Sequence, residues 1–183
     1  MREEDLKWND LKSEVVLKCP IMEIRAKDCE SATGVRGHYY VLDARNWVVI
    51  LPVKDGKFIM VRQWRHGSNC MTTEFPGGTG NAGEDPMYSA SREMEEEIGY
   101  RAGKMTKLGE VNPNPALFSN CLHVYLAEEL TDLGHQNLDK DEFINCVEVP
   151  IEEVIKNYGS GEYIHAFMGT ALSFYQRYIS ENK

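Results

Sequence analysis

The alternation of hydrophobic and polar positions predicts β-strands over the first third of the chain. Short apolar runs occupy residues 13–29 and 37–46, and Pro20 divides the first run into one or two strands. The clearest local signal spans residues 47–65, where two runs rich in Val, Ile and Phe flank a Lys-Asp-Gly turn at residues 54–56. This arrangement predicts an antiparallel hairpin.

The pattern changes to helical spacing after a glycine-rich loop at residues 73–85. Asp85 is a favourable N-cap, Pro86 suits the first helical position, and Gly99 suits the residue that ends a helix. We therefore predict a helix over residues 86–98. Its apolar residues recur at helical spacing and form one buried stripe: Met87, Ala90, Met94 and Ile98.

Further strands and helices follow this segment. Apolar runs predict strands at residues 107–111, 121–130 and 142–149, a short helix at 150–158 and a closing helix at 161–182. Strands on both sides of one helix, with more helix at the end, predict a mixed α/β or α+β fold. A length of 183 residues is enough to bury a sizeable core.

Composition and charge restrict the cellular compartment in which we expect the protein and the partners that we expect it to bind. Apolar residues make up 42% of the chain, the first residues are acidic rather than a secretory signal, and no apolar run approaches the ~18 residues of a membrane helix. The five cysteines are scattered without a Cys-x-x-Cys pair, so we expect reduced thiols and a cytoplasmic protein. A net charge of −9 without a basic run predicts neither nucleic acid nor membrane as a partner.

The predicted helix carries four glutamates within five positions: Glu93, Glu95, Glu96 and Glu97. At about 100° per residue, Glu93, Glu96 and Glu97 share an arc of roughly 100° beside the apolar stripe, whereas Glu95 points to solvent. Converging, partly buried carboxylates are costly unless a cation neutralises them, and hard oxygen ligands suit Mg²⁺ or Mn²⁺. The alternative is a solvated acidic face.

The residues around this cluster follow the longer pattern G-x(5)-E-x(7)-R-E-U-x-E-E-x-G-U, in which U is a bulky apolar residue. The pattern resembles the Nudix box of the Nudix hydrolase superfamily. Its seven fixed identities would coincide by chance in about one window in 10⁸ at ordinary residue frequencies, which disfavours the solvated face. The matching residues are Gly78, Glu84, Arg92, Glu93, Glu96, Glu97 and Gly99.

The resemblance implies a Nudix fold, with a mixed sheet between helices, and Mg²⁺-dependent hydrolysis of a nucleoside diphosphate linked to a further group. Mn²⁺ could replace Mg²⁺, and two or three ions are expected. The implied metal ligands are Glu93, Glu96, Glu97 and the backbone carbonyl of Gly77, with Glu96 and Glu97 counted as catalytic. Supporting roles fall to Gly78, to Arg92 through salt bridges to the glutamates, and to Glu84 beneath the loop or a metal-bound water.

Flanking segments resemble the ADP-ribose and nucleoside diphosphate-sugar pyrophosphatase branch. Residues 74–78 read EFPGG, with Gly77 where the branch usually has alanine, residues 61–67 read VRQWRHG, and Pro115 lies fifteen residues after the box. In that branch, additional N-terminal strands pair with a second subunit and shape the nucleotide pocket. We therefore expect a homodimer, with residues 1–45 as that element and 46–183 as the hydrolase domain.

The candidate substrate-binding residues each have a competing structural role. Arg62 and Arg65 could grip phosphates or form strand-edge salt bridges. Trp47, with Tyr39 and Tyr40, could stack on a base or ribose, or pack in the core or the dimer. Pro115 and Asn120, with Asn112 and Asn114, could contact the sugar or only shape turns. Glu142 stands where the branch often has a catalytic glutamate on a loop, and Asp139 and Asp141 are rival candidates for that role. The alternative is that Glu142 is only a solvated charge on the loop.

The sequence thus predicts cleavage of a nucleoside diphosphate sugar, such as ADP-ribose or GDP-mannose, to a nucleoside monophosphate and a sugar phosphate. Residues 112–120 read NPNPALFSN instead of the Ser-Pro-Gly segment of strict ADP-ribose enzymes, which favours a looser nucleotide-sugar specificity. Two alternatives are a nucleoside triphosphate or dinucleotide pyrophosphohydrolase of the same superfamily and a non-catalytic ligand-sensing module. Such modules tend to lose the box glutamates, and this chain keeps them.

Overall fold

The computed structural model describes residues 1–182, which form two compact units. The first unit contains Met1–Arg45 together with Asn112–Cys121, and the second contains Asn46–Val111 together with the chain from Leu122 onward. The segment around Pro115 therefore belongs to the same unit as the N-terminal strands. None of the helices formed by residues 1–182 has the length and apolar character that a membrane span requires.

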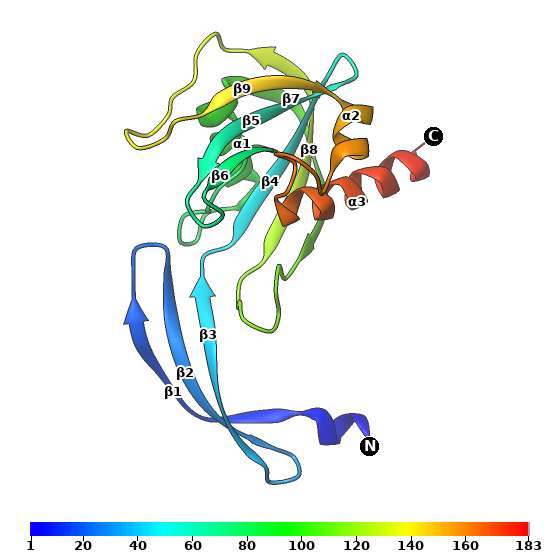
Figure 1. Ribbon diagram of the computed structural model, residues 1–183. Coiled ribbons are helices and arrows are strands. Elements are labelled where there is room, and N and C mark those ends of the chain that lie inside the picture. The colour runs from blue at the N-terminus through cyan, green and yellow to red at the C-terminus, as the bar shows by residue number, and fades with distance from the viewer. Residues whose placement is uncertain (183) are drawn as a thin grey trace. The chain divides into compact units, whose positions relative to one another are not determined.

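The first unit is built on an antiparallel sheet in the order β1-β2-β3 (Figure 1). A short 3₁₀ helix, η1 (Glu3–Leu6), precedes β1 (Trp8–Lys18), β2 (Met22–Ser31) and β3 (Arg36–Ala44). The break predicted near Pro20 separates β1 from β2. Every residue of β1 is exposed, although the strand carries several apolar side chains: Trp8, Leu11, Val15, Val16 and Leu17.

The second unit is built on a six-stranded mixed sheet in the order β6-β5-β4-β8-β7, with β9 paired to β5. β4 runs parallel to β8, and the other pairs are antiparallel. The strands are β4 (Trp47–Lys54), β5 (Lys57–Arg65), β6 (Cys70–Glu74), β7 (Tyr100–Val111), β8 (Leu122–Asp132) and β9 (Asn145–Pro150). The helices are α1 (Pro86–Ile98), α2 (Ile151–Asn157) and α3 (Ala166–Glu181). These elements confirm the predicted mixed α/β fold.

The predicted hairpin joins β4 to β5. Its two turn residues, Asp55 and Gly56, have φ values of 49° and 76°. Positive φ at both central positions gives a turn whose twist matches that of the flanking strands. The β4–β5 ladder then holds only two residue pairs, because β4 diverges to pair with β8 while β5 pairs with β6 and β9.

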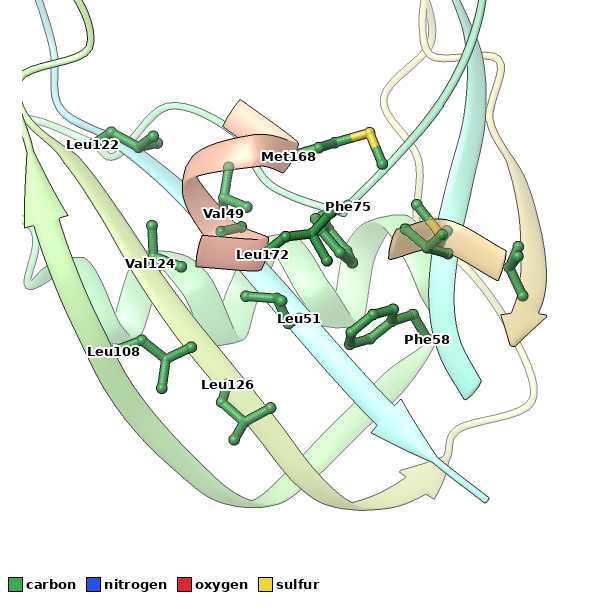
Figure 2. Packing of buried hydrophobic residues seen from close by; sticks show 14 residues of the cluster. Val49, Leu51, Phe58, Phe75, Leu108, Leu122, Val124, Leu126, Met168 and Leu172 are labelled. Carbon is green, nitrogen blue, oxygen red and sulfur yellow. The ribbon is translucent and has the colours of Figure 1, made fainter. Parts of the chain in front are cut away.

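Successive side chains of a strand point to opposite faces of the sheet, and alternate residues of β4 pack in two separate buried clusters. Val49 and Leu51 of β4 pack in a cluster with Met168 and Leu172 of α3, as Figure 2 shows. The alternate residues Val48 and Ile50 pack in a second cluster with the apolar stripe of α1: Ala90, Met94 and Ile98. α1 and α3 therefore cover opposite faces, and the core fixes the direction in which the α1 glutamates point.

Both ends of α1 match the prediction, whereas the start of α3 does not. Asp85 accepts hydrogen bonds from the backbone N–H of Met87 at 2.9 Å and of Tyr88 at 3.2 Å, and Gly99 ends the helix at φ 69°. The closing helix begins at Ala166 rather than at residue 161. Gly161 has φ 56°, which interrupts a right-handed helix, and His165 supplies the cap.

Candidate active site

Glu97 is the most deeply buried carboxylate of the box. It is 4% exposed, and its Oε2 accepts a hydrogen bond from the backbone N–H of Gly77 at 2.8 Å. Burial raises the pKa of Glu97 to about 8, and the charge of Glu93 adds to the shift. A positive charge beside Glu97 would therefore be needed to stabilise its ionised form.

Arg92 holds the other glutamates of the cluster in place. Its guanidinium lies 2.9 Å from Glu93, 2.8 Å from Glu96 and 3.4 Å from Glu84. Burial raises the pKa of Glu93 in spite of this neighbour. Glu95 is bound separately by Arg101, at 2.7 and 3.0 Å. Arg92 thus contacts two of the three carboxylates expected to act together, Glu93 and Glu96, while Glu95 has a different partner.

Glu84 stabilises the start of the box. It accepts hydrogen bonds from the backbone N–H of Asn81 at 2.9 Å and from the Ser89 hydroxyl at 2.6 Å. The bond from Asn81 is the main reason why the pKa of Glu84 falls to about 2, and Ser89 and Arg92 contribute further. Glu84 therefore ties the loop to the first turns of α1.

Gly77 and Gly78 bring the loop against β4. Backbone hydrogen bonds join Val48 N–H to the Gly78 carbonyl at 2.9 Å and Gly78 N–H to the Val48 carbonyl at 3.1 Å. A Cβ atom on Gly77 would lie 2.1 Å from the Val48 carbonyl oxygen, and one on Gly78 would lie 2.5 Å from Oε2 of Glu93. Gly77 therefore requires glycine in this chain, because the obstacle is backbone, whereas a side chain at Gly78 would displace the carboxylate of Glu93.

The donor set suits a divalent cation. Across residues 1–182, no group of three or more His, Cys, Asp or Glu side chains converges closely enough to hold a metal ion. Arg92 contacts Glu93 and Glu96, and the Gly77 N–H contacts Glu97. Glu97 is nonetheless a buried carboxylate and Glu93 a partly buried one, and burial raises the pKa of both. A hard dication ligated by their oxygens would relieve that cost, so the residues fit Mg²⁺ or Mn²⁺.

The loop after β8 brings Glu142 towards the box. The negative charge of Glu142 contributes to the raised pKa of both Glu93 and Glu97. The loop is fastened to the end of α1 by the bonds Leu133 N–H to the Gly99 carbonyl, 2.8 Å, and Asn137 N–H to the Glu96 carbonyl, 2.9 Å. The Gln136 amide also donates to the Glu97 carbonyl. No sequence signal pointed to Gln136, because its partner Glu97 lies 39 residues earlier in the chain.

The two candidate phosphate-binding arginines differ in their surroundings. Arg62 donates hydrogen bonds from Nε and Nη2 to the carboxylate of Glu162, at 2.7 and 2.6 Å. This is the strand-edge salt bridge that was the alternative to phosphate binding. Arg65 donates from Nε to Glu74 at 2.7 Å, and its charge lowers the pKa of Glu97. Both arginines are therefore held in ion pairs, and the charge of Arg65 in addition acts on Glu97.

The Arg62–Glu162 pair predicts a pH-dependent contribution to stability. Arg62, followed by the Thr73 hydroxyl, lowers the pKa of Glu162 from 4.5 to about 2. The pair therefore stabilises the fold above pH 4.5, and this contribution is lost as the pH falls through about 2. We expect Glu162→Gln to lower the urea midpoint at pH 7. The difference between the midpoints of wild type and variant should shrink steadily as the pH falls from 4 to 2. A difference independent of pH would contradict this role.

A cavity of about 320 Å³ lies beside the Gly77–Gly78 loop. Trp47 lines it and packs against Phe167 at 5.2 Å between ring centroids. Arg65 also reaches this cavity. Three further lining residues were not among the predicted site residues: Glu74, His165 and Phe167. Glu74 belonged to a recognised motif, but His165 and Phe167 reach the loop only through the packing of α3.

The remaining candidates belong to the first unit. Asn120 is 3% exposed and donates to the Arg45 carbonyl at 2.6 Å, while Asn112 donates to the Phe118 carbonyl at 2.9 Å. Pro115 is exposed in the turn between them, and Tyr39 and Tyr40 are exposed on β3. The two amides thus shape this segment, and any contact with a substrate remains a prediction.

The chain is similar in sequence and in fold to several known proteins. A sequence model of the NUDIX domain matches residues 43–167. ADP-ribose pyrophosphatase of Bacillus subtilis (strain 168) is 33% identical over 126 residues, 68% of each chain. ADP compounds hydrolase NudE of Escherichia coli (strain K12) is 29% identical over 120 residues, 64% of each chain. A solved structure described as an ADP compounds hydrolase shares the fold, with a TM-score of 0.88, 23% identity and coverage of 99% of this chain and 98% of that one.

Proposed function

The chain belongs to the NUDIX domain family, and on that premise we propose that it hydrolyses the diphosphate bond of a nucleoside diphosphate sugar, such as ADP-ribose or GDP-mannose. The products would be a nucleoside monophosphate and a sugar phosphate. The observation that carries the proposal is the buried carboxylate of Glu97 and the partly buried one of Glu93, both held against the Gly77–Gly78 loop beside a cavity. The names of the two relatives, which act on ADP-ribose and ADP compounds, support this substrate class.

Glu93, Glu96, Glu97 and the Gly77 carbonyl would hold two or three Mg²⁺ or Mn²⁺ ions. Such ions screen the charge of a diphosphate and acidify water. Arg92 would keep Glu93 and Glu96 in place, since it contacts both. Arg65, whose charge lowers the pKa of Glu97, would attract the diphosphate towards that carboxylate.

Glu142 is the proposed general base. Its carboxylate is close enough to Glu93 and Glu97 to raise the pKa of both, so it could accept the proton of a water that attacks phosphorus beside them. Asp139 and Asp141 remain rivals on the same loop. Asp139 donates its backbone N–H to Oε2 of Glu142 at 3.0 Å, which would orient that carboxylate.

The metal assignment predicts a binding effect that needs no turnover. We expect millimolar Mg²⁺ or Mn²⁺ to raise the thermal unfolding midpoint, because an ion that binds only the folded state stabilises it. Glu93→Gln should reduce the increase, since it removes one ligand charge. Glu95→Gln is the matched control on the opposite side of α1 and should keep the full increase. Equal increases in both variants would contradict the assigned ligands.

The exposed apolar residues of β1 support a homodimer formed through the N-terminal strands, which we also propose shape the nucleotide pocket. Val16 and Leu17 are 51% and 56% exposed, and Tyr40 on β3 is 55% exposed. Light scattering should give the mass of a dimer, and Val16→Lys should weaken it by placing a charge in the interface. Lys12→Gln, on the same strand, should remain dimeric. A wild-type monomer with full activity would contradict this role.

A hydrolysis screen tests the proposed reaction and its alternatives. The compounds are ADP-ribose, GDP-mannose, UDP-glucose, FAD, NADH, diadenosine polyphosphates and nucleoside triphosphates, each with Mg²⁺ and with Mn²⁺. We expect the highest kcat/KM with a nucleoside diphosphate sugar. Preference for a triphosphate or dinucleotide would overturn the substrate class, and binding without turnover would instead indicate a ligand-sensing module.

The cysteines and the net charge bear on the compartment and the partners of the protein. All five cysteines are free thiols, which suits a reducing compartment, and we propose the cytoplasm. The net charge of −9 supports a small-molecule substrate rather than nucleic acid as the partner.

A further inference from the structure

The cavity beside the Gly77–Gly78 loop has a polar side as well as an aromatic one. Its wall is formed by the start of β4, the ends of β5 and β6, the loop and the start of α3. The same loop contacts the box carboxylates, because Gly77 N–H donates to Glu97 and Gly78 lies against Glu93. A group in the cavity would therefore lie next to whatever the box carboxylates bind.

Glu74 places a carboxylate oxygen on the polar side. Its side chain is 3% exposed, and Oε1 accepts hydrogen bonds from Arg65 Nε at 2.7 Å and from the Thr72 hydroxyl at 2.8 Å. Its other oxygen, Oε2, lies 3.6 Å from Nε2 of His165. That separation exceeds a hydrogen bond, so the two atoms stand side by side without satisfying each other.

The tautomer of His165 follows from its role as the cap of α3. Its Nδ1 accepts a hydrogen bond from the backbone N–H of Phe167 at 3.2 Å. Burial lowers the pKa of His165, so the ring is neutral and its proton resides on Nε2. The cavity therefore presents a donor, His165 Nε2–H, beside an acceptor, Glu74 Oε2.

The size, charge and walls of the cavity restrict its ligand. Its volume of about 320 Å³ is at the lower end of small-molecule sites. Glu74 balances the charge of Arg65, which also lines the cavity, so the lining offers no excess positive charge to select a phosphate. A neutral hydroxyl can both donate to a carboxylate and accept from an imidazole. The rings of Trp47 and Phe167, tilted by 42°, offer apolar faces to C–H groups. These features together fit a sugar ring.

We propose that this cavity binds the sugar on the far side of the substrate diphosphate, with its hydroxyls donating to Glu74 and accepting from His165. This inference rests on the proposed function and names the part of the substrate that the cavity selects. The nucleoside would then lie outside the cavity.

Equilibrium binding of two non-hydrolysable probes in Mg²⁺ tests the assignment. One probe is α,β-methylene ADP-ribose, and the other is α,β-methylene ADP, which lacks the sugar. We expect the wild type to bind the first at least about 10-fold more tightly, because it gains hydrogen bonds that include a charged acceptor. His165→Asn keeps an N-cap acceptor but shortens the side chain, and should remove most of that difference without changing Kd for α,β-methylene ADP.

Glu74→Gln gives a second, nearly isosteric variant, which keeps one oxygen for Thr72 and Arg65 and should also reduce the preference for the sugar-bearing probe. Ser173→Ala, on the exposed side of α3, is the control and should keep it. Equal weakening of both probes in His165→Asn, or unchanged binding of both, would overturn the sugar assignment while leaving the diphosphate site intact. Failure of the wild type to bind either probe would instead overturn the proposed function.

Discussion

Replacing Glu97 by Gln is expected to lower the rate of nucleoside diphosphate sugar hydrolysis by about 10³-fold or more. A loss of that size corresponds to about 4 kcal/mol of transition-state stabilisation, within the range that one cation interaction supplies. The amide has the same shape and can still accept the hydrogen bond from Gly77, which now measures 2.8 Å. The substitution therefore removes the charge that would hold a cation and little else.

The unfolding midpoint separates this effect from damage to the fold. Without added metal, Glu97→Gln should be as stable as the wild type or more stable, because it removes a charge from a site that is 4% exposed. Glu95→Gln is the control for turnover: Glu95 pairs with Arg101 outside the cluster, so its rate should stay within about 2-fold. A near-normal rate for Glu97→Gln would remove Glu97 from the metal ligands.

Gly77→Ala is expected to have the largest effect on stability. A Cβ atom at this position would lie 2.1 Å from the Val48 carbonyl oxygen, and the backbone φ of 156° is one that side chains rarely adopt. We expect a loss of about 3 kcal/mol or more in the free energy of unfolding, from overpacking and backbone strain combined. Urea denaturation at pH 7 measures it.

The matched control is Gly67→Ala, where a Cβ would meet no atom within 4 Å; its stability should change by less than about 0.5 kcal/mol. An alanine at position 77 that leaves the urea midpoint unchanged would show that β4 and the loop move apart easily.

The sequence predicted α1 and its carboxylates well because their signals are local. Asp85, Pro86 and Gly99 mark the ends of the helix within the sequence itself, and helical spacing alone separates Glu95 from Glu93. Strand β6 was not predicted. One reason is that its residues 73–74 were assigned to the glycine-rich loop. Its place in the sheet depends on pairing with β5, which no short-range pattern reveals.

The surroundings of the site depend on contacts that are distant in sequence. Arg62 was a candidate phosphate ligand, but its partner Glu162 lies 100 residues further along the chain. Glu74 and His165 meet only because α3 packs on the face of the sheet opposite α1. Residue type and local spacing can nominate such side chains, but the tertiary fold decides which of them meet.

Phosphorus NMR of ADP-ribose incubated with the protein and Mg²⁺ shows directly whether the diphosphate bond is cleaved. We expect the two diphosphate resonances to disappear and two phosphomonoester resonances, from AMP and ribose 5-phosphate, to replace them in equal amounts. The same sample with Glu97→Gln should change about 10³-fold more slowly. Diphosphate resonances that persist with the wild-type protein, for ADP-ribose and for the other nucleoside diphosphate sugars alike, would contradict the proposed function.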